Sequence, residues 1–116
     1  MRYLALIYGN EAASLNATQE EQAAVMQAYY AFTQEIEESG AMLGGEALMP
    51  TNTATTVRIR EGKALVTDGP FAETKEQLAG FYLIKCANLD EAIEVASKIP
   101  GVKTGSIELR PVMEFE

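Results

Sequence analysis

The residues best placed to do chemistry lie in the stretch VTDGPFAETKEQLAGFYLI, residues 66–84. Asp68 ends an apolar run, and the sequence Gly-Pro-Phe follows it before a charged segment that contains Lys75. A carboxylate held at a strand end can accept a proton, and a neighbouring cation can hold the carboxylate of an organic acid. These residue types therefore point to proton abstraction from, or binding of, a small anionic molecule.

Asp68 also has a structural interpretation. An aspartate at the start of a turn accepts backbone N–H bonds, while Pro70 presets φ and Gly69 tolerates the restriction that precedes a proline. We favour this turn role over proton transfer, and the two are compatible because both need a rigidly held carboxylate. Phe71 is expected to anchor the loop on the core.

Two candidate ligand contacts lie outside the predicted strand interiors. Lys75 offers a cation to an anionic ligand if its loop folds back beside Asp68, whereas its neighbours Glu73 and Glu76 suggest a solvated loop. Tyr8 lies at the end of an apolar run, where a phenol hydroxyl group can face a ligand while the ring packs on the core.

Two arginines on predicted strands complete the candidate ligand site. Arg58 and Arg110 lie where a side chain has a defined direction, because successive residues of a strand face opposite sides. Arg110 shares a face with Glu108, so a structural salt bridge is as good an interpretation as a ligand contact.

Histidine is absent from all 116 residues, and Cys86 is the only cysteine. A Ser-His-Asp or Cys-His nucleophile system and the common imidazole metal sites are therefore excluded. Cys86 lies within a predicted strand and is expected to be a small buried side chain rather than a nucleophile. We expect neither a metal nor another cofactor, and a chain without an internal disulfide is typical of the cytoplasm.

The net charge of −8 argues against nucleic-acid binding, because phosphate neutralisation needs a surplus of Lys and Arg. The cations at 58, 60, 63, 75 and 110 lie in fewer segments than the acids, which leaves room for a local anion pocket. No apolar run approaches the roughly 18 residues of a membrane span, and the N-terminal run is too short for a signal peptide. We therefore expect a cytoplasmic protein that binds neither nucleic acid nor membrane.

Two helices are marked by their ends and by their apolar period. The first begins with the capping box of Thr18 and Glu21, ends at Gly40, and directs one apolar stripe toward the core: Val25, Tyr29, Phe32 and Ile36. The second begins at Asn88, ends before residues 100–101, and is expected to carry these residues inward: Leu89, Ile93, Ala96 and Ile99.

The remaining segments predict strands. Residues 2–8 and 79–87 look like central strands, the first of them buried on both faces, and residues 106–112 form the last strand. The first half of residues 41–54 predicts a short strand before a loop. Residues 56–67 predict a β-hairpin that turns at Glu61 and Gly62.

The order of these elements predicts one α+β domain over residues 1–116. Without the inserted hairpin it reads βαββαβ, the ferredoxin-like split βαβ arrangement. Both helices then cover one sheet face, and the other face exposes apolar side chains to water. We therefore expect a homodimer in which the two sheets share a barrel-like core.

The stretch at Asp68, Gly69, Pro70 and Phe71 closely resembles the signature of the DGPF group within the YCII-related family of small bacterial proteins. The likeness extends to RYLALIYG, to TATTVRIREGKALVTDG and to SIELRPV, so it covers nearly the whole chain. The resemblance implies a dimeric, ferredoxin-like α+β barrel. Some family proteins resemble muconolactone-processing enzymes, and some domains accompany sigma-factor-type regulators.

The chain departs from the family pattern at one chemically important point. In YCII-like relatives a His-Asp pair is the suspected catalytic dyad, and this sequence has no histidine. Asp68 therefore cannot inherit a role in orienting an imidazole, and the resemblance gives less support to enzymatic activity here.

Two classes of function remain open. The favoured class is a non-catalytic ligand-binding or regulatory module, in which a homodimer holds a small anionic metabolite in a cleft near the DGPF loop. The alternative is a lyase, isomerase or dehalogenase that acts on an organic acid, with Asp68 as general base and a nearby cation on the carboxylate. That chemistry needs only a positioned carboxylate and a charge stabiliser, so the missing histidine does not forbid it.

Overall fold

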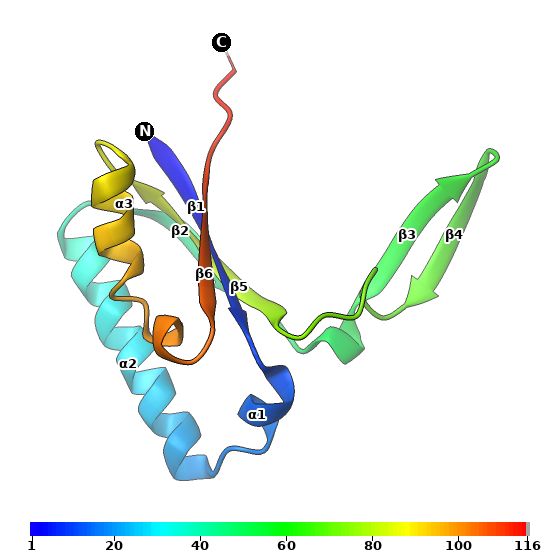
Figure 1. The fold of residues 1–116 in the computed structure, drawn as a ribbon, viewed down its shortest axis with the longest axis horizontal. Helices are drawn as coiled ribbons and strands as arrows, with labels where there is room; N and C mark the ends of the chain where they lie inside the picture. The colour runs from blue at the N-terminus through cyan, green and yellow to red at the C-terminus, as the bar shows by residue number, and fades with distance from the viewer. Residues whose placement is uncertain (116) are drawn as a thin grey trace.

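The computed structural model describes residues 1–115, in which two helices pack on one face of an antiparallel sheet (Figure 1). Within these residues the sheet has the order β2-β5-β1-β6, with the bounds β1 Arg2–Gly9, β2 Met42–Ala47, β5 Gln77–Lys85 and β6 Ser106–Pro111. The helices are α2 (Gln19–Glu38) and α3 (Leu89–Ala96). This order confirms the α+β, ferredoxin-like prediction.

The inserted hairpin forms a separate two-stranded unit that we call the arm, residues 55–68. It consists of β3 (Thr55–Arg60) and β4 (Lys63–Asp68), which pair with each other and not with the four-stranded sheet. Glu61 and Gly62 form its turn with φ values of 52° and 75°, the left-handed geometry that matches the twist of paired strands. Figure 1 shows the arm projecting from the side of the sheet opposite to α2 and α3.

The core lies between the sheet and the two helices. Alternate residues of β1 and β5 point into it, and the buried set comprises Tyr3, Ala5, Ile7, Phe32, Ile36, Tyr82, Ile84, Cys86, Ala92, Ala96 and Ile99. The rings of Phe32 and Tyr82 meet edge to face with centroids 5.2 Å apart, and the Tyr82 hydroxyl group shares a 2.8 Å hydrogen bond with Thr33. The hydroxyl group of Tyr3, the other buried tyrosine, donates to the Met1 sulfur at 3.7 Å, so the core is apolar with both of its phenols paired.

The long helix begins and ends as the sequence predicts. The Thr18 hydroxyl group accepts from the Glu21 N–H, the Glu21 carboxylate accepts from the Thr18 N–H, and Gly40 follows the helix with a φ of 79°. Of the predicted stripe, Phe32 and Ile36 are buried, whereas Val25 is exposed because the first turns of α2 extend past the ends of the strands (Figure 1).

The inward face of α3 differs from the prediction. Ala96 and Ile99 are buried as predicted, but Leu89 and Ile93 are about half exposed, and Ala92 is buried instead. Two alanines on the contact face let the helix backbone lie close to the sheet, so the larger side chains are displaced to its flanks. The prediction is confirmed for Ala96 and Ile99 and wrong for Leu89 and Ile93, because an apolar period does not show which of the apolar side chains fits against the sheet.

Three short helical segments were not predicted. They are α1 (Glu11–Leu15), and the 3-10 turns η1 (Thr51–Thr53) and η2 (Pro100–Lys103). The first has no buried residue and hence no apolar period to reveal it, although Asn10 caps it by accepting from the Ala13 N–H.

None of the helices in residues 1–115 combines the length and the apolar character needed to cross a membrane.

Candidate functional site

The sheet face that points away from α2 and α3 is the first part of the candidate site, and we call it the open face. Strand alternation and pairing assign to it these side chains of β1, β5 and β6: Leu4, Leu6, Tyr8, Phe81, Leu83, Glu108 and Arg110. The apolar members and Tyr8 are partly buried against one another, while Tyr3, Ala5 and Ile7 on the other face are fully buried. The first strand is thus central, as predicted, but only its helix side is fully buried.

Arg110 lies on the open face in an ion pair with Glu108. Its Nε donates to a Glu108 carboxylate oxygen at 2.7 Å, and both side chains are well exposed. This bond and the charge of Glu108 raise the pKa of Arg110, and Tyr8 adds a smaller contribution. The salt bridge, one of the two interpretations of Arg110, is confirmed, and the ligand contact stays a prediction. Because the recorded bond uses only Nε, the terminal N–H groups can still hold a carboxylate.

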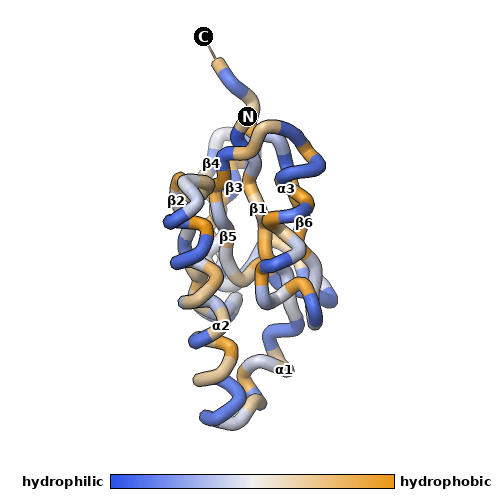
Figure 2. Tube along the Cα trace, turned by 90° about the vertical axis from the view of Figure 1, so that its left-hand side faces the viewer, coloured by the Kyte–Doolittle hydropathy of each residue, from blue (hydrophilic) through white to orange (hydrophobic). Residues whose placement is uncertain are grey.

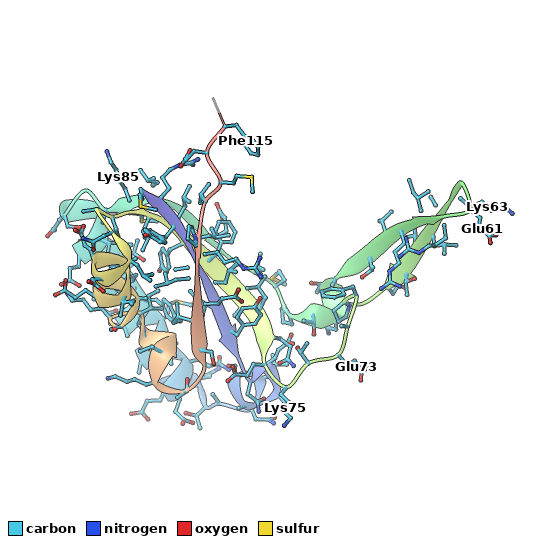
Figure 3. The ribbon with its side chains drawn as sticks, turned by 45° about the horizontal axis from the view of Figure 1, so that its top comes forward. Glu61, Lys63, Glu73, Lys75, Lys85 and Phe115 are labelled. Atoms are coloured by element: carbon cyan, nitrogen blue, oxygen red, sulfur yellow. The ribbon has the colours of Figure 1, made fainter. Side chains whose placement is uncertain are left out.

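Tyr8 and Lys75 belong to the same end of the sheet. Tyr8 pairs with Ser106 on one side and follows a register shift in its pairing with β5, a bulge of the kind that redirects side chains. Lys75 precedes β5 by two residues, and the first residue of β5, Gln77, pairs with Gly9. Figure 3 shows Lys75 at this end, well away from the arm tip.

The arm carries two of the candidate residues, Arg58 and Asp68, on opposite faces. Arg58 pairs with Leu65, and Asp68 pairs with Thr55, so parity along the strands places the two charged side chains on opposite faces. Both are exposed. Within the described chain no ion pair joins Asp68 to a cation, and Lys75 forms none either. The structure therefore does not gather Asp68, Arg58 and Lys75 into one site.

The loop after Asp68 is held by other groups. The Gly69 N–H donates to Ala54 O at 2.7 Å, and the Thr56 hydroxyl group donates to Gly69 O at 2.8 Å. Gly69 has a φ of 102°, which favours glycine. Phe71 is 77% exposed, so the prediction that it anchors the loop on the core was wrong. The turn is closed by Thr56, because the hydroxyl group of its side chain reaches across the root of the arm.

Cys86 is buried directly after β5, and its N–H donates to Met1 O at 2.9 Å. Burial raises the pKa of its thiol, and the charge of Glu91 raises it further. The predicted role as a small buried side chain is confirmed, since a raised pKa suppresses the thiolate that a nucleophile needs.

A small cavity of about 170 Å³ lies at the same end of the sheet as Tyr8, between α1, η1 and the start of β5. The Glu11 carboxylate accepts from the Thr51 hydroxyl group at 2.7 Å, and Gln77 accepts from the Glu11 N–H at 3.0 Å. The polar groups at this cavity are thus paired within the chain and pin α1 to η1 and β5. No sequence signal marks this cluster, because Glu11 belongs to a helix without an apolar period.

A second cavity of about 280 Å³ lies between the end of α2 and α3, on the helix side of the sheet. Four charged residues line it: Glu35, Lys85, Glu91 and Lys98. Ligand pockets usually measure roughly 300–1,000 Å³, so both cavities are small for a metabolite. Neither contains any of the candidate residues that the sequence singles out.

The fold and site together define a ferredoxin-like α+β protein with an open apolar sheet face and a projecting arm. A family model of the YCII-related domain matches residues 1–116, and the chain belongs to that family. It is 43% identical over 118 residues to an uncharacterised protein of Rhizobium meliloti (strain 1021), in an alignment that covers all of this chain and 95% of that relative. The resemblance seen in the sequence is confirmed at the level of the family.

Proposed function

We propose that this protein forms a homodimer through its open face and binds a small anionic metabolite at the rim of that interface. It acts as a ligand-binding or regulatory module rather than as a catalyst. The observation that supports this function is the open face itself, where apolar side chains border Arg110 and Tyr8 on the same side of the sheet.

The apolar centre of the open face supports the homodimer. Leu4 and Leu6 pair with Leu83 and Phe81, which makes one continuous apolar patch across β1 and β5. Burying apolar surface contributes about 25 cal/mol per Å², and a second copy supplies the same patch through a two-fold axis. The face is thus self-complementary in its chemistry.

The polar rim of the open face supports an anionic ligand. The terminal N–H groups of Arg110 match the two oxygens of a carboxylate, and the Tyr8 hydroxyl group offers a further hydrogen bond. The ligand has to compete with Glu108, which is bonded to Nε of Arg110 at 2.7 Å, so its carboxylate alone contributes little affinity. The affinity is therefore expected to be highest for ligands whose apolar part also enters the interface. Small aromatic and unsaturated organic acids have this combination.

The non-catalytic function is favoured by the position of Asp68. A general base acts within about 2.6–3.2 Å of the proton it removes, beside a group that stabilises the new charge. Asp68 is exposed on the arm, and Arg58 projects from the other face of that arm. A lyase, isomerase or dehalogenase would need a second chain to bring a cation to Asp68.

We place the protein in the cytoplasm, where the free thiol of Cys86 is stable.

A thermal-shift screen of small aromatic and unsaturated carboxylic acids tests this function. The melting temperature of the wild type is expected to rise with ligand concentration. The melting temperature of Arg110→Ala is expected not to change with ligand concentration. Lys98→Ala is the matched control, because Lys98 is paired with Glu35 at 3.4 Å on the helix side. Hits that stabilise all three proteins equally would place the ligand elsewhere.

A further inference from the structure

We propose that the arm packs one of its faces on a second copy of this chain and thereby completes the dimer. The inference rests on the proposed homodimer and adds to it a contact surface outside the open face. It also assigns Asp68 to the contact between the two subunits.

The arm has one apolar face. Register places on it the pairs Val57–Val66 and Ile59–Ala64, and the exposed fractions of Val57, Ile59 and Val66 are 63%, 68% and 67%. A two-stranded hairpin is marginally stable in water unless a further surface covers its apolar face. The chain itself provides no such cover within residues 1–115, because every residue from 57 to 68 is exposed.

The shape of the single chain indicates where the cover comes from. Its radius of gyration is 16.2 Å, whereas a compact domain of this length has about 13 Å. The arm lies on the open-face side of the sheet in Figure 1, and Figure 2 places it behind the sheet as seen from the helices. The arm and the open face therefore lie on the same side of the molecule, where one partner can meet both.

Charge complementarity favours a second copy as that partner. Residues 55–68 contain three of the nine Lys and Arg residues and two of the 17 Asp and Glu residues, which leaves six cations and 15 acids elsewhere. The arm thus has a net charge of +1, and the rest of the chain has a net charge of −9. The acidic bodies of two copies repel each other, whereas the arm of one copy is attracted by the body of the other, so the arm is the segment that electrostatics favours at the contact during association.

The area of contact also favours engagement of the arm. A four-stranded sheet about eight residues long has a footprint of about 500 Å², and two strands of six residues add about 200 Å². A standard interface buries about 800 Å² of accessible surface on each partner, a quantity that exceeds the flat footprint of the same contact because side chains roughen the surface. The arm enlarges the footprint that a second copy can cover by about two fifths, from about 500 to about 700 Å².

Asp68 shares the apolar face of the arm. It pairs with Thr55, an even number of residues from Val57, so its side chain emerges beside Val66 at the root of the arm. The three cations of the arm, Arg58, Arg60 and Lys63, belong to the other face. When the apolar face packs on the second copy, Asp68 enters the contact and the cations stay in solvent.

Substitution of two adjacent arm residues tests the inference. Val66→Lys places a charge on the apolar face, and Leu65→Lys makes the same kind of change on the opposite face of the same strand. In sedimentation equilibrium we expect Val66→Lys to raise the dimer Kd at least tenfold and Leu65→Lys to change it less than threefold. An unchanged Kd for Val66→Lys, or equal losses in the two variants, would overturn the inference.

Hydrogen exchange of the wild type provides a second measurement that does not depend on how a variant folds. Backbone amides of β3 and β4 should gain at least tenfold protection as the protein concentration rises through the dimer Kd. Amides of the arm that exchange equally fast in monomer and dimer would show that the arm remains free.

A substitution on the open face separates this inference from the proposed function. Leu6→Lys is expected to dissociate the dimer whether or not the arm takes part. If Leu6→Lys dissociates it and Val66→Lys does not, the arm inference fails and the proposed homodimer stands. A wild type that stays monomeric at every concentration overturns both.

Discussion

Arg58 and Asp68 lie on the two paired strands of the arm and project from its opposite faces. Arg58 pairs with Leu65, whereas Asp68 pairs with Thr55 at the other end of the ladder. A carboxylate base and the cation that holds its substrate therefore cannot both come from one arm. An anion bound by Arg58 would lie on the face of the arm opposite to Asp68, out of reach of its carboxylate.

The Asp68 carboxylate is expected to contribute little to the geometry of its turn. Asp68→Asn should leave the exchange protection of the Gly69 amide within about twofold of wild type, because that amide donates to Ala54 O. Thr56→Val removes the hydroxyl bond to Gly69 O and should lower protection by about fivefold, equivalent to about 1 kcal/mol. Hydrogen exchange by NMR compares the two. A larger loss in Asp68→Asn than in Thr56→Val would restore the turn-brace interpretation.

A side chain at Gly101 is expected to destabilise the fold, because Tyr29 would have to move. A Cβ atom there would lie 2.6 Å from the Tyr29 hydroxyl oxygen, which accepts from the Gly101 N–H at 3.1 Å. Gly101→Ala should therefore lower the free energy of unfolding by about 1–3 kcal/mol in urea titrations. Gly44→Ala is the control, since no atom lies within 4 Å of its added Cβ.

A double variant checks the cause of that loss. Tyr29→Phe removes the oxygen that the new methyl group would meet, so the loss caused by Gly101→Ala should be smaller in this background. Equal losses in both backgrounds would show that the close approach to Tyr29 is not responsible.

The capping box predicts a pH-dependent contribution to stability. The Glu21 carboxylate accepts from the Thr18 N–H at 3.0 Å, and this bond lowers the pKa of Glu21 from its usual value of 4.5. A lowered folded-state pKa gives stability that is present above pH 4.5 and is lost as the pH falls through the folded-state value. Wild type should therefore exceed Glu21→Gln in urea midpoint at neutral pH and match it in strong acid. A difference that is independent of pH would contradict this account.

Cys86 is expected to react slowly with thiol reagents in the native protein. Burial raises the pKa of the thiol and hides it from reagents, so that an aromatic disulfide reagent reaches it only when the structure opens locally. Labelling at pH 8 should therefore be at least about tenfold slower than for an exposed thiol. The matched control is Cys86→Ala combined with Ala87→Cys, which moves the thiol to the exposed neighbouring position. Equal labelling rates would show that the site opens freely.

Local signals were sufficient to predict most of the fold. Thr18 and Asn88 cap their helices with side chains that accept from residues three positions on, and Glu61 begins the turn of the arm. Such features depend on neighbours in sequence, so the sequence alone reveals them. The helix faces depend on tertiary fit, which is why Leu89 and Ile93 were wrongly placed in the core.

Part of the candidate site was also accessible from the sequence. A two-residue turn at Glu61 pairs its flanking residues, and the resulting register already separates Arg58 from Asp68. The alternation of the last strand likewise places Arg110 beside Glu108, as observed. The direction in which the arm leaves the sheet was not accessible, because the loops that set it, residues 48–54 and 69–76, have no periodic signal.

The pairing of Ala47 with Gly80 has a consequence for chain length. Ala47 is the last residue of β2 and Gly80 is the fourth residue of β5, and they face each other although residues 48–79 lie between them. The two strands are antiparallel neighbours, so a tight turn would suffice to join them, and the long excursion closes a gap that is already short. Because the entropy of loop closure grows only slowly with length, the part of this excursion outside the sheet, residues 48–76, can lengthen at a small entropic cost, whereas residues 77–79 belong to β5. The segment between Ala47 and Gln77 is thus a place where the sheet accepts insertions, and where a foreign segment can be grafted.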